Sequence, residues 1–177
     1  MERVHLLIVY TGNGKGKTTA AMGMLLRSLG QGGRCAVLQF IKPDSLETGE
    51  KLISRKLEVL WENYGEGFLW DQESEEPTRV ACRQGWMRAK TLISSEAYDL
   101  VILDEFTYVL KHGYVSMEEF SDFFEGLKGK VKTPHVVITG RDAPKNLVDI
   151  ADMVHEIVEI KHPWRTAQIP AQPMIEY

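Results

Sequence analysis

The stretch TGNGKGKTT, residues 11–19, sets the architecture of this 177-residue chain. It lies between the apolar run 4–10 and the apolar segment 20–26, an order that predicts a strand, a tight loop and a helix. Backbone N–H groups of a glycine-rich turn, together with a helix N-terminus, favour a bound polyphosphate. The alternative is a flexible basic loop before an ordinary helix. The order strand, loop, helix favours the phosphate site.

Two side chains of this loop have distinct expected roles. Lys17 supplies a mobile positive charge, and the hydroxyl of Thr18 can reach a magnesium ion bound to the phosphates. Thr11 stands where the general pattern has glycine. The residues that we expect to bind nucleotide are Gly12, Asn13, Gly14, Lys15, Gly16, Lys17, Thr18 and Thr19.

A second informative site follows the apolar run 100–103, where Asp104 and Glu105 stand side by side. A strand of this kind delivers both carboxylates to its carboxyl end, across from the loop hydroxyl. Magnesium on bound phosphates needs such an anionic partner. We therefore expect a metal site made of Thr18 with Asp104, Glu105 or both; an acidic pair without metal is the alternative.

The composition predicts one soluble globular domain over residues 1–177, with 44% hydrophobic and 26% charged residues. The net charge is −4 and no lysine and arginine block occurs, which argues against generic nucleic-acid binding. The first apolar run is too short for a signal peptide or a membrane span, so we expect a cytoplasmic protein. Cys35 and Cys82 are expected to be reduced, buried thiols. The histidines show no zinc-binding spacing.

Strand-like and helix-like segments alternate along the chain, which predicts an α/β fold with a mostly parallel sheet covered on both faces. Ligands of such folds bind at the carboxyl ends of the strands. The predicted strands are 4–10, 35–41, 57–61, 100–103, 135–139 and 153–160. The predicted helices are 20–29, a short one within 44–55, 75–95, 117–128 and 145–151, with an extended tail over 162–177.

Local signals support two of these helices. Ser74 is the expected N-cap of helix 75–95, in which Val80, Trp86, Met87 and Leu92 recur at loosely helical intervals. Ser116 and Glu119 form a capping box before helix 117–128, with Val115 and Phe120 as its hydrophobic staple.

Two further features leave alternatives open. Arg141, after the strand 135–139, can pair with phosphate or with a surface carboxylate. The stretch 64–71 puts two glycines beside three aromatic residues; Phe68 and Trp70 either fold back onto the core or form a lid over a flat ligand. Composition alone favours the core.

These motifs together resemble the ATP:corrinoid adenosyltransferases of the P-loop type, over nearly the whole chain. The resemblance rests on VYTGNGKGKTTAA at 9–21, QFIK at 39–42, GFLW at 67–70, LDEFTY at 103–108, ITGR at 138–141 and the C-terminal motifs at 158–163, 171–172 and 175–177.

The resemblance implies a three-layer, RecA-like P-loop NTPase fold that is usually homodimeric. It implies transfer of the 5′-deoxyadenosyl group of ATP to the cobalt(I) of a corrinoid such as cobalamin, cobinamide or cobyrinic acid a,c-diamide, releasing triphosphate. Magnesium accompanies ATP, and a reductase or flavodoxin-like donor supplies electrons. Lys15, Lys17 and Thr18, with magnesium and either Glu105 or Asp104, would hold the triphosphate. Phe68 and Trp70 would crowd the lower face of the corrinoid, which reverses the preference for a core role.

Two other function classes share the loop and the acids. A P-loop ATPase or small-molecule kinase would use Glu105 as a base toward water or an acceptor hydroxyl and would transfer phosphorus instead of carbon. A nucleotide-dependent switch would bind ATP without turnover. Product analysis separates these classes, because adenosyl transfer yields intact triphosphate.

Overall fold

Six parallel strands form one central sheet in the computed structural model, which describes residues 4–67, 75–130 and 132–175. Their order across the sheet is β3-β2-β4-β5-β1-β6, and every pairing between them is parallel, as the alternation of strands and helices predicts. The strands are β1 Leu7–Thr11, β2 Cys35–Phe40, β3 Leu60–Tyr64, β4 Leu100–Asp104, β5 His135–Thr139 and β6 Met153–Glu156.

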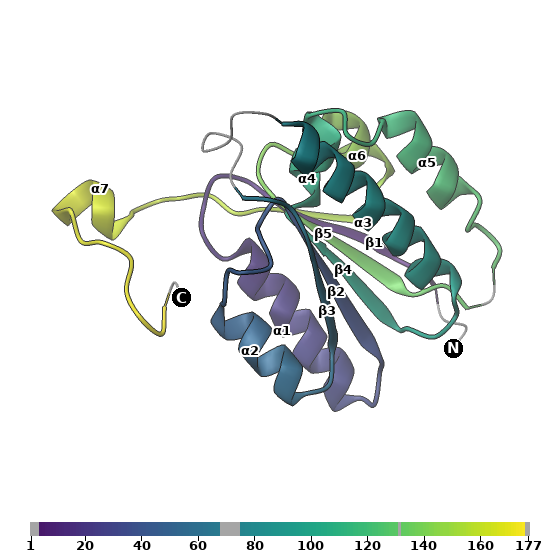
Figure 1. Ribbon diagram of the computed structural model, residues 1–177, viewed down its shortest axis with the longest axis horizontal. Coiled ribbons are helices and arrows are strands. Elements are labelled where there is room, and N and C mark those ends of the chain that lie inside the picture. Colours follow the sequence, from purple (N-terminus) through teal and green to yellow (C-terminus); the bar gives the residue numbers. More distant parts are fainter. Residues whose placement is uncertain (1–3, 68–74, 131, 176–177) are drawn as a thin grey trace.

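Helices cover both faces of this sheet, so the molecule has three layers (Figure 1). Helices α1 and α2 lie on one face, and α3 to α6 lie on the other. The helices are α1 Lys17–Gly30, α2 Gly49–Lys56, α3 Glu76–Ser94, α4 Phe106–Lys111, α5 Met117–Glu125, α6 Lys145–Ile150 and α7 Pro163–Ala167. This is the α/β architecture of a P-loop NTPase-like fold, as expected from the sequence.

The strands divide their side chains between two apolar cores because successive residues point to opposite faces. In β4, Val101 and Leu103 join the core under α3, α4 and α5, whereas Leu100 and Ile102 join the core under α1. Residues of β2 are buried on both faces, as its continuous apolar run predicts.

Several element boundaries differ from the expectation. The third strand begins at Leu60 instead of residue 57, because Leu57 ends α2 and Glu58 has a positive φ of 54°. Helix α4 has no counterpart among the predicted helices; it follows the acidic pair directly. The sixth strand ends at Glu156 instead of continuing to residue 160.

Helix α3 confirms the helix expected over 75–95, and the four apolar residues that indicated it divide between its two faces. Trp86 and Leu92 are buried, but Val80 and Met87 are 46% and 63% exposed. Loosely helical spacing therefore predicts the helix correctly but does not by itself distinguish its buried face from its exposed face. The expected N-cap, Ser74, lies outside the described residues.

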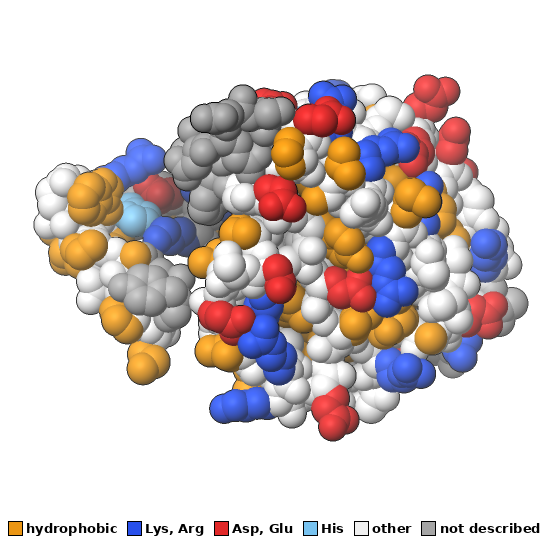
Figure 2. Space-filling view, viewed as in Figure 1, with side chains coloured by type: hydrophobic (Ala, Val, Ile, Leu, Met, Phe, Trp, Pro, Cys, Tyr) orange, Lys and Arg blue, Asp and Glu red, His pale blue; other side chains and the backbone are white. Residues whose placement is uncertain are grey.

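The chain after β6 forms a C-terminal arm, residues 157–175, that extends away from the three-layer body (Figure 1). The expectation of a wholly extended tail is wrong, since the arm contains α7, whose N-terminus is capped by His162. Hydrophobic side chains are exposed along the arm (Figure 2), among them Ile160 at 96% and Met174 at 94%.

Both cysteines are free and buried, as expected. Burial raises the pKa of the Cys35 thiol and raises the pKa of Cys82 to about 12, so both stay protonated at neutral pH. Among the described helices, none has the length and apolar character needed to cross a membrane.

Candidate functional site

The phosphate loop joins β1 to α1 and carries its lysine in a preformed position. The Lys17 ammonium donates hydrogen bonds to the carbonyl oxygens of Gly12 and Gly14, at 2.8 and 2.7 Å. Gly16, the N-cap of α1, has a φ of 111°, which a residue with a side chain rarely adopts. Burial lowers the pKa of Lys17, an effect that the negative charge of Glu105 opposes.

The loop glycines also serve a contact that the sequence does not indicate. The chain leaving β6 crosses the loop: Ile157 N–H donates to the Thr11 carbonyl at 2.8 Å, and Gly14 N–H donates to the Ile157 carbonyl at 2.7 Å. A Cβ at Gly12 or Gly14 would lie only 2.5 or 2.8 Å from that carbonyl oxygen. The Gly14 amide is therefore already bonded within the protein, and the chain passes over the loop directly after the last residue of β6, Glu156.

Asp104 is fully buried at the end of β4 and is held by three donors. Its Oδ1 accepts from the hydroxyls of Thr18 at 2.8 Å and Thr139 at 2.6 Å, and its Oδ2 accepts from the Gln39 amide at 2.8 Å. The Lys42 ammonium lies 3.9 Å from Oδ2. Because Thr18 directs its proton to Asp104, the lone pairs of its oxygen are left for a cation.

Glu105 has a different environment from its neighbour. It adopts a left-handed conformation, with φ 60°, and its backbone N–H donates to the Thr139 hydroxyl at 3.0 Å. No side chain of the described part of the chain forms a hydrogen bond or ion pair with its carboxylate. Burial, and then the charge of Asp104, raise the pKa of Glu105. A carboxylate in this setting gains from a bound cation.

Arg141 is brought to the same site by a fixed turn. The Thr107 hydroxyl of α4 donates to the Arg141 carbonyl at 2.7 Å, and a Cβ at Gly140 would overlap that hydroxyl oxygen. The turn after β5 is thus held against α4. The sequence leaves Arg141 open between phosphate and surface pairing; in the structure its side chain lines the cleft beside the phosphate loop.

A cleft of about 570 Å³ lies at the carboxyl ends of the strands. It brings together most of the expected site residues, and Glu105 lines it whereas Asp104 does not. The lining residues are Gly14, Lys15, Gly16, Lys17, Thr18, Thr19, Gln39, Ile41, Lys42, Thr48, Glu50, Glu105, Tyr108, Arg141 and Ile175.

Sequence reasoning from the residues themselves assigns no roles to Gln39, Lys42 and Tyr108. Gln39 and Lys42 could have been predicted as site residues from their place at the end of β2, since the carboxyl ends of parallel strands share one edge of the sheet. Asn13 lines a neighbouring cavity with Arg141 and Arg165 of the arm. Phe68 and Trp70, the expected corrinoid contacts, lie outside the described residues.

The donors in the cleft suit a hard cation. Thr18 contributes a hydroxyl and Glu105 a carboxylate, and Mg²⁺ prefers oxygen ligands supplied by one or two protein groups together with phosphates and water. Across the ranges that the structure describes, no group of three or more His, Cys, Asp or Glu side chains could form an all-protein metal cage.

Comparison with known proteins gives a consistent result. Residues 3–177 match the family model described as ATP:corrinoid adenosyltransferase BtuR/CobO/CobP. A corrinoid adenosyltransferase of Sinorhizobium sp. is 39% identical over 175 residues, covering 97% of this chain and 80% of that protein. The corrinoid adenosyltransferase of Escherichia coli K12 is 37% identical, and that of Salmonella typhimurium LT2, named CobA, is 36% identical; each match covers 97% of this chain and 85% of the relative.

Proposed function

The chain belongs to the ATP:corrinoid adenosyltransferase family BtuR/CobO/CobP, and we propose that it performs this family's reaction in the cleft beside its phosphate loop. The protein is an enzyme that adenosylates corrinoids with ATP as the adenosyl donor. The observation that carries the proposal for the site is the convergence of Lys17, Thr18 and Glu105 on one cleft.

The chemistry explains why this cleft needs no general base. The nucleophile, cobalt(I), is a metal-centred electron pair without a proton to remove. It forms a bond to C5′ of ATP, and the C5′–O bond breaks with its electron pair leaving on triphosphate. The protein must therefore stabilise the leaving group, align C5′ and exclude water.

Stabilisation of the leaving group falls to the phosphate loop and the residues beside it. Lys17 donates to two loop carbonyls and lies within the cleft, so its charge is available where triphosphate would gain negative charge. Arg141 and Lys42, which line the same cleft, add two further cations. Lys15, Thr19 and the loop amides of Gly12, Asn13 and Gly16 are proposed to bind the same triphosphate.

We assign Mg²⁺ to Thr18 and Glu105, with Asp104 as the acceptor that orients the Thr18 hydroxyl. This division is supported by the different environments of the two carboxylates. Asp104 already accepts hydrogen bonds from three donors, whereas the carboxylate of Glu105 has no such partner among the described side chains. When bound, the cation neutralises charge on the phosphates. Glu105 and Thr18 would supply its protein oxygens, and Lys17 would contact phosphate with the N–H that is not bonded to the loop carbonyls.

The corrinoid partner and the assembly rest on the resemblance. Phe68 and Trp70 are proposed to press on the lower face of the corrinoid, displacing its lower ligand so that cobalt(II) is easier to reduce. A homodimer, an electron-donating reductase or flavodoxin-like partner and a cytoplasmic location are proposed on the same ground.

The test is anaerobic incubation of the protein with ATP, chemically reduced corrinoid and either Mg²⁺ or a chelator. We expect a light-sensitive cobalt–carbon product that forms with Mg²⁺ and is strongly reduced without it. Thr18→Ala should show the same low yield under both conditions. Equal product with and without the cation would contradict the magnesium assignment, and no product at all would contradict the proposed site.

A further inference from the structure

A row of polar side chains crosses three strands at the edge where the cleft opens. The sheet register pairs Asn63 of β3 with Gln39 of β2, and Gln39 with Asp104 of β4. Residues in one register row of parallel strands point to the same face, so these three side chains are neighbours. Trp61, two residues before Asn63, shares that face and packs beside the core under α1.

These side chains form a continuous chain of hydrogen bonds. Trp61 Nε1 donates to Asn63 Oδ1 at 3.1 Å, and Asn63 Nδ2 donates to Gln39 Oε1 at 2.9 Å. Gln39 Nε2 then donates to Asp104 Oδ2 at 2.8 Å. Gln39 and Asp104 are 1% and 0% exposed, so water does not readily replace the bond between them, whereas Asn63 is only partly buried.

The two ends of the chain fix its direction. An indole N–H can only donate, and an ionised carboxylate can only accept. Each amide between them must therefore present its oxygen toward Trp61 and its nitrogen toward Asp104. A side-chain amide alone can rotate by half a turn and exchange these groups. Here one reversal would place an oxygen against the Asp104 carboxylate.

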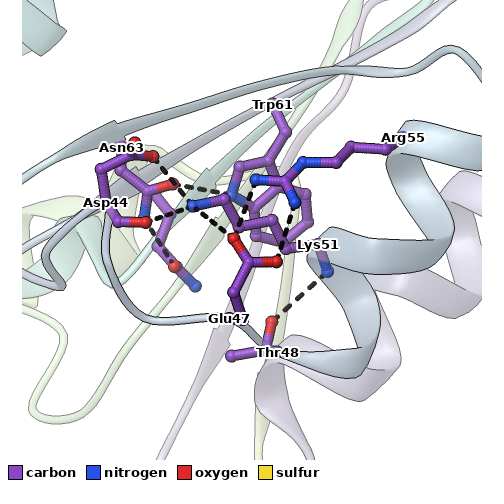
Figure 3. A network of polar contacts seen from close by, with 8 residues as sticks. Asp44, Glu47, Thr48, Lys51, Arg55, Trp61 and Asn63 are labelled. Carbon is purple, nitrogen blue, oxygen red and sulfur yellow. Dashed lines mark hydrogen bonds and ion pairs between the residues drawn. The ribbon is translucent and has the colours of Figure 1, made fainter.

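Asn63 also lies beside an ion pair between the buried Lys51 and the exposed Asp44. Lys51 is 3% exposed, and its ammonium is 2.8 Å from Asp44 Oδ1, which ties the chain after β2 to α2. Figure 3 shows Asn63 and Trp61 next to Lys51 and Asp44.

We propose that Asn63 and Gln39 are positioning residues for the magnesium site, acting through Asp104. By holding Asp104 Oδ2, they leave Oδ1 directed at Thr18, whose hydroxyl proton it accepts. The oxygen of Thr18 is then oriented toward the cleft. This inference rests on the proposed role of Thr18 as a magnesium ligand.

The test compares two variants of Asn63 by calorimetry of ATP binding with and without Mg²⁺. Asn63→Asp keeps the shape but cannot donate, so Gln39 must turn its oxygen toward Asp104; we expect Mg²⁺-ATP affinity to fall about tenfold or more. Asn63→Ala removes the donor but leaves Gln39 in place, because water can reach the partly exposed position. The loss of Mg²⁺-ATP affinity in Asn63→Ala should be clearly smaller than in Asn63→Asp.

Two controls separate positioning from charge and folding. An added negative charge alone would weaken the binding of Mg²⁺-free ATP at least as much as that of Mg²⁺-ATP, because free ATP carries more negative charge. Loss of positioning should instead leave Mg²⁺-free ATP affinity within about twofold of wild type. In a Gln39→Ala background, Asn63→Asp should add less than about a twofold effect, since the connection to Asp104 is already broken. The unfolding midpoint of each variant checks that it folds.

Two results would overturn the proposal: a loss in Asn63→Ala as large as in Asn63→Asp, or independent, multiplying effects of the Gln39 and Asn63 substitutions. Failure of the proposed magnesium site has a different signature: wild-type protein itself would bind ATP with the same affinity whether or not Mg²⁺ is present. Failure of the proposed function would appear only in turnover, as the absence of adenosylated corrinoid.

Discussion

Glu105 carries a cost in stability that its substitution should reveal. Burial and the charge of Asp104 raise its pKa, so the folded state holds the protonated form more tightly than the unfolded state does. The ionised carboxylate therefore lowers stability as pH rises from below its ordinary pKa through the raised value in the folded protein. Above the raised pKa, the full loss of folding stability remains.

We predict that Glu105→Gln raises the unfolding midpoint at neutral pH and abolishes most Mg²⁺-dependent transfer. The gain in the midpoint should shrink below about pH 4, where the unfolded carboxyl is also protonated. Calorimetric scans at neutral and acid pH check this. A variant that is less stable than wild type at neutral pH would show that the carboxylate is satisfied by the protein itself.

Lys17 and Lys15 provide a matched pair within the phosphate loop. Lys17 is buried and donates to two carbonyls, whereas Lys15 is exposed. We predict that Lys17→Ala weakens Mg²⁺-ATP binding by about a hundredfold with the fold intact, since charge-assisted hydrogen bonds are among the strongest. Lys15→Ala should cost much less. Titration calorimetry measures both, and wild-type affinity in Lys17→Ala would refute the assignment.

The sequence predicts which residues form the site better than it predicts the role of each residue. Asp104 and Glu105 are expected together, but a linear pattern does not specify which carboxylate faces the cleft. That depends on strand alternation, which puts Asp104 on the buried face of Ile102, and on the left-handed turn at Glu105. The involvement of Gln39 and Asn63 depends on register, which sequence alone leaves open.

Among the helices and strands, α3 packs closely against the sheet at Gly85. A Cβ there would lie 2.6 Å from the Tyr64 ring and 2.7 Å from the Phe40 ring. A Cβ added at Gly23 of α1 would have no neighbour within 4 Å, and this residue faces solvent. The two glycines therefore separate packing from helix propensity.

We predict opposite signs for these two substitutions. Gly85→Ala should lower the free energy of unfolding by about 1–3 kcal/mol through overpacking. Gly23→Ala should raise it by about 0.5–1 kcal/mol, because alanine favours the helix. Denaturant unfolding gives both values. Stabilisation by Gly85→Ala would mean that the helix can move away from β3 without loss.

Helix signals are reliable where they are local. Ser116 caps α5 by accepting the Glu119 N–H at 3.1 Å, as expected. The side chain of Glu119, however, accepts from Trp86 Nε1 at 2.7 Å and pairs with Arg83, so it joins α5 to α3. Tertiary partners replace the second half of the capping box, and no local pattern could indicate that.

Across the whole fold, alternation of strands and helices correctly predicts a parallel, covered sheet with its site at one edge. The order of the strands is not predictable from alternation alone. The arm shows a further limit: the Ile157 N–H still donates to Thr11 of β1, but the Ile157 carbonyl accepts from Gly14 of the phosphate loop, a contact between segments more than 140 residues apart in the chain. Long-range contacts of this kind decide where a strand ends.

In the proposed reaction the phosphate loop holds a leaving group while carbon, not phosphorus, is transferred. The most direct measurement is phosphorus NMR of the products after anaerobic turnover with ATP, Mg²⁺ and chemically reduced corrinoid, with Lys17→Ala as the inactive control. We predict intact triphosphate in step with the light-sensitive cobalt–carbon product. Formation of ADP and phosphate, with no adenosylated corrinoid, would contradict carbon transfer.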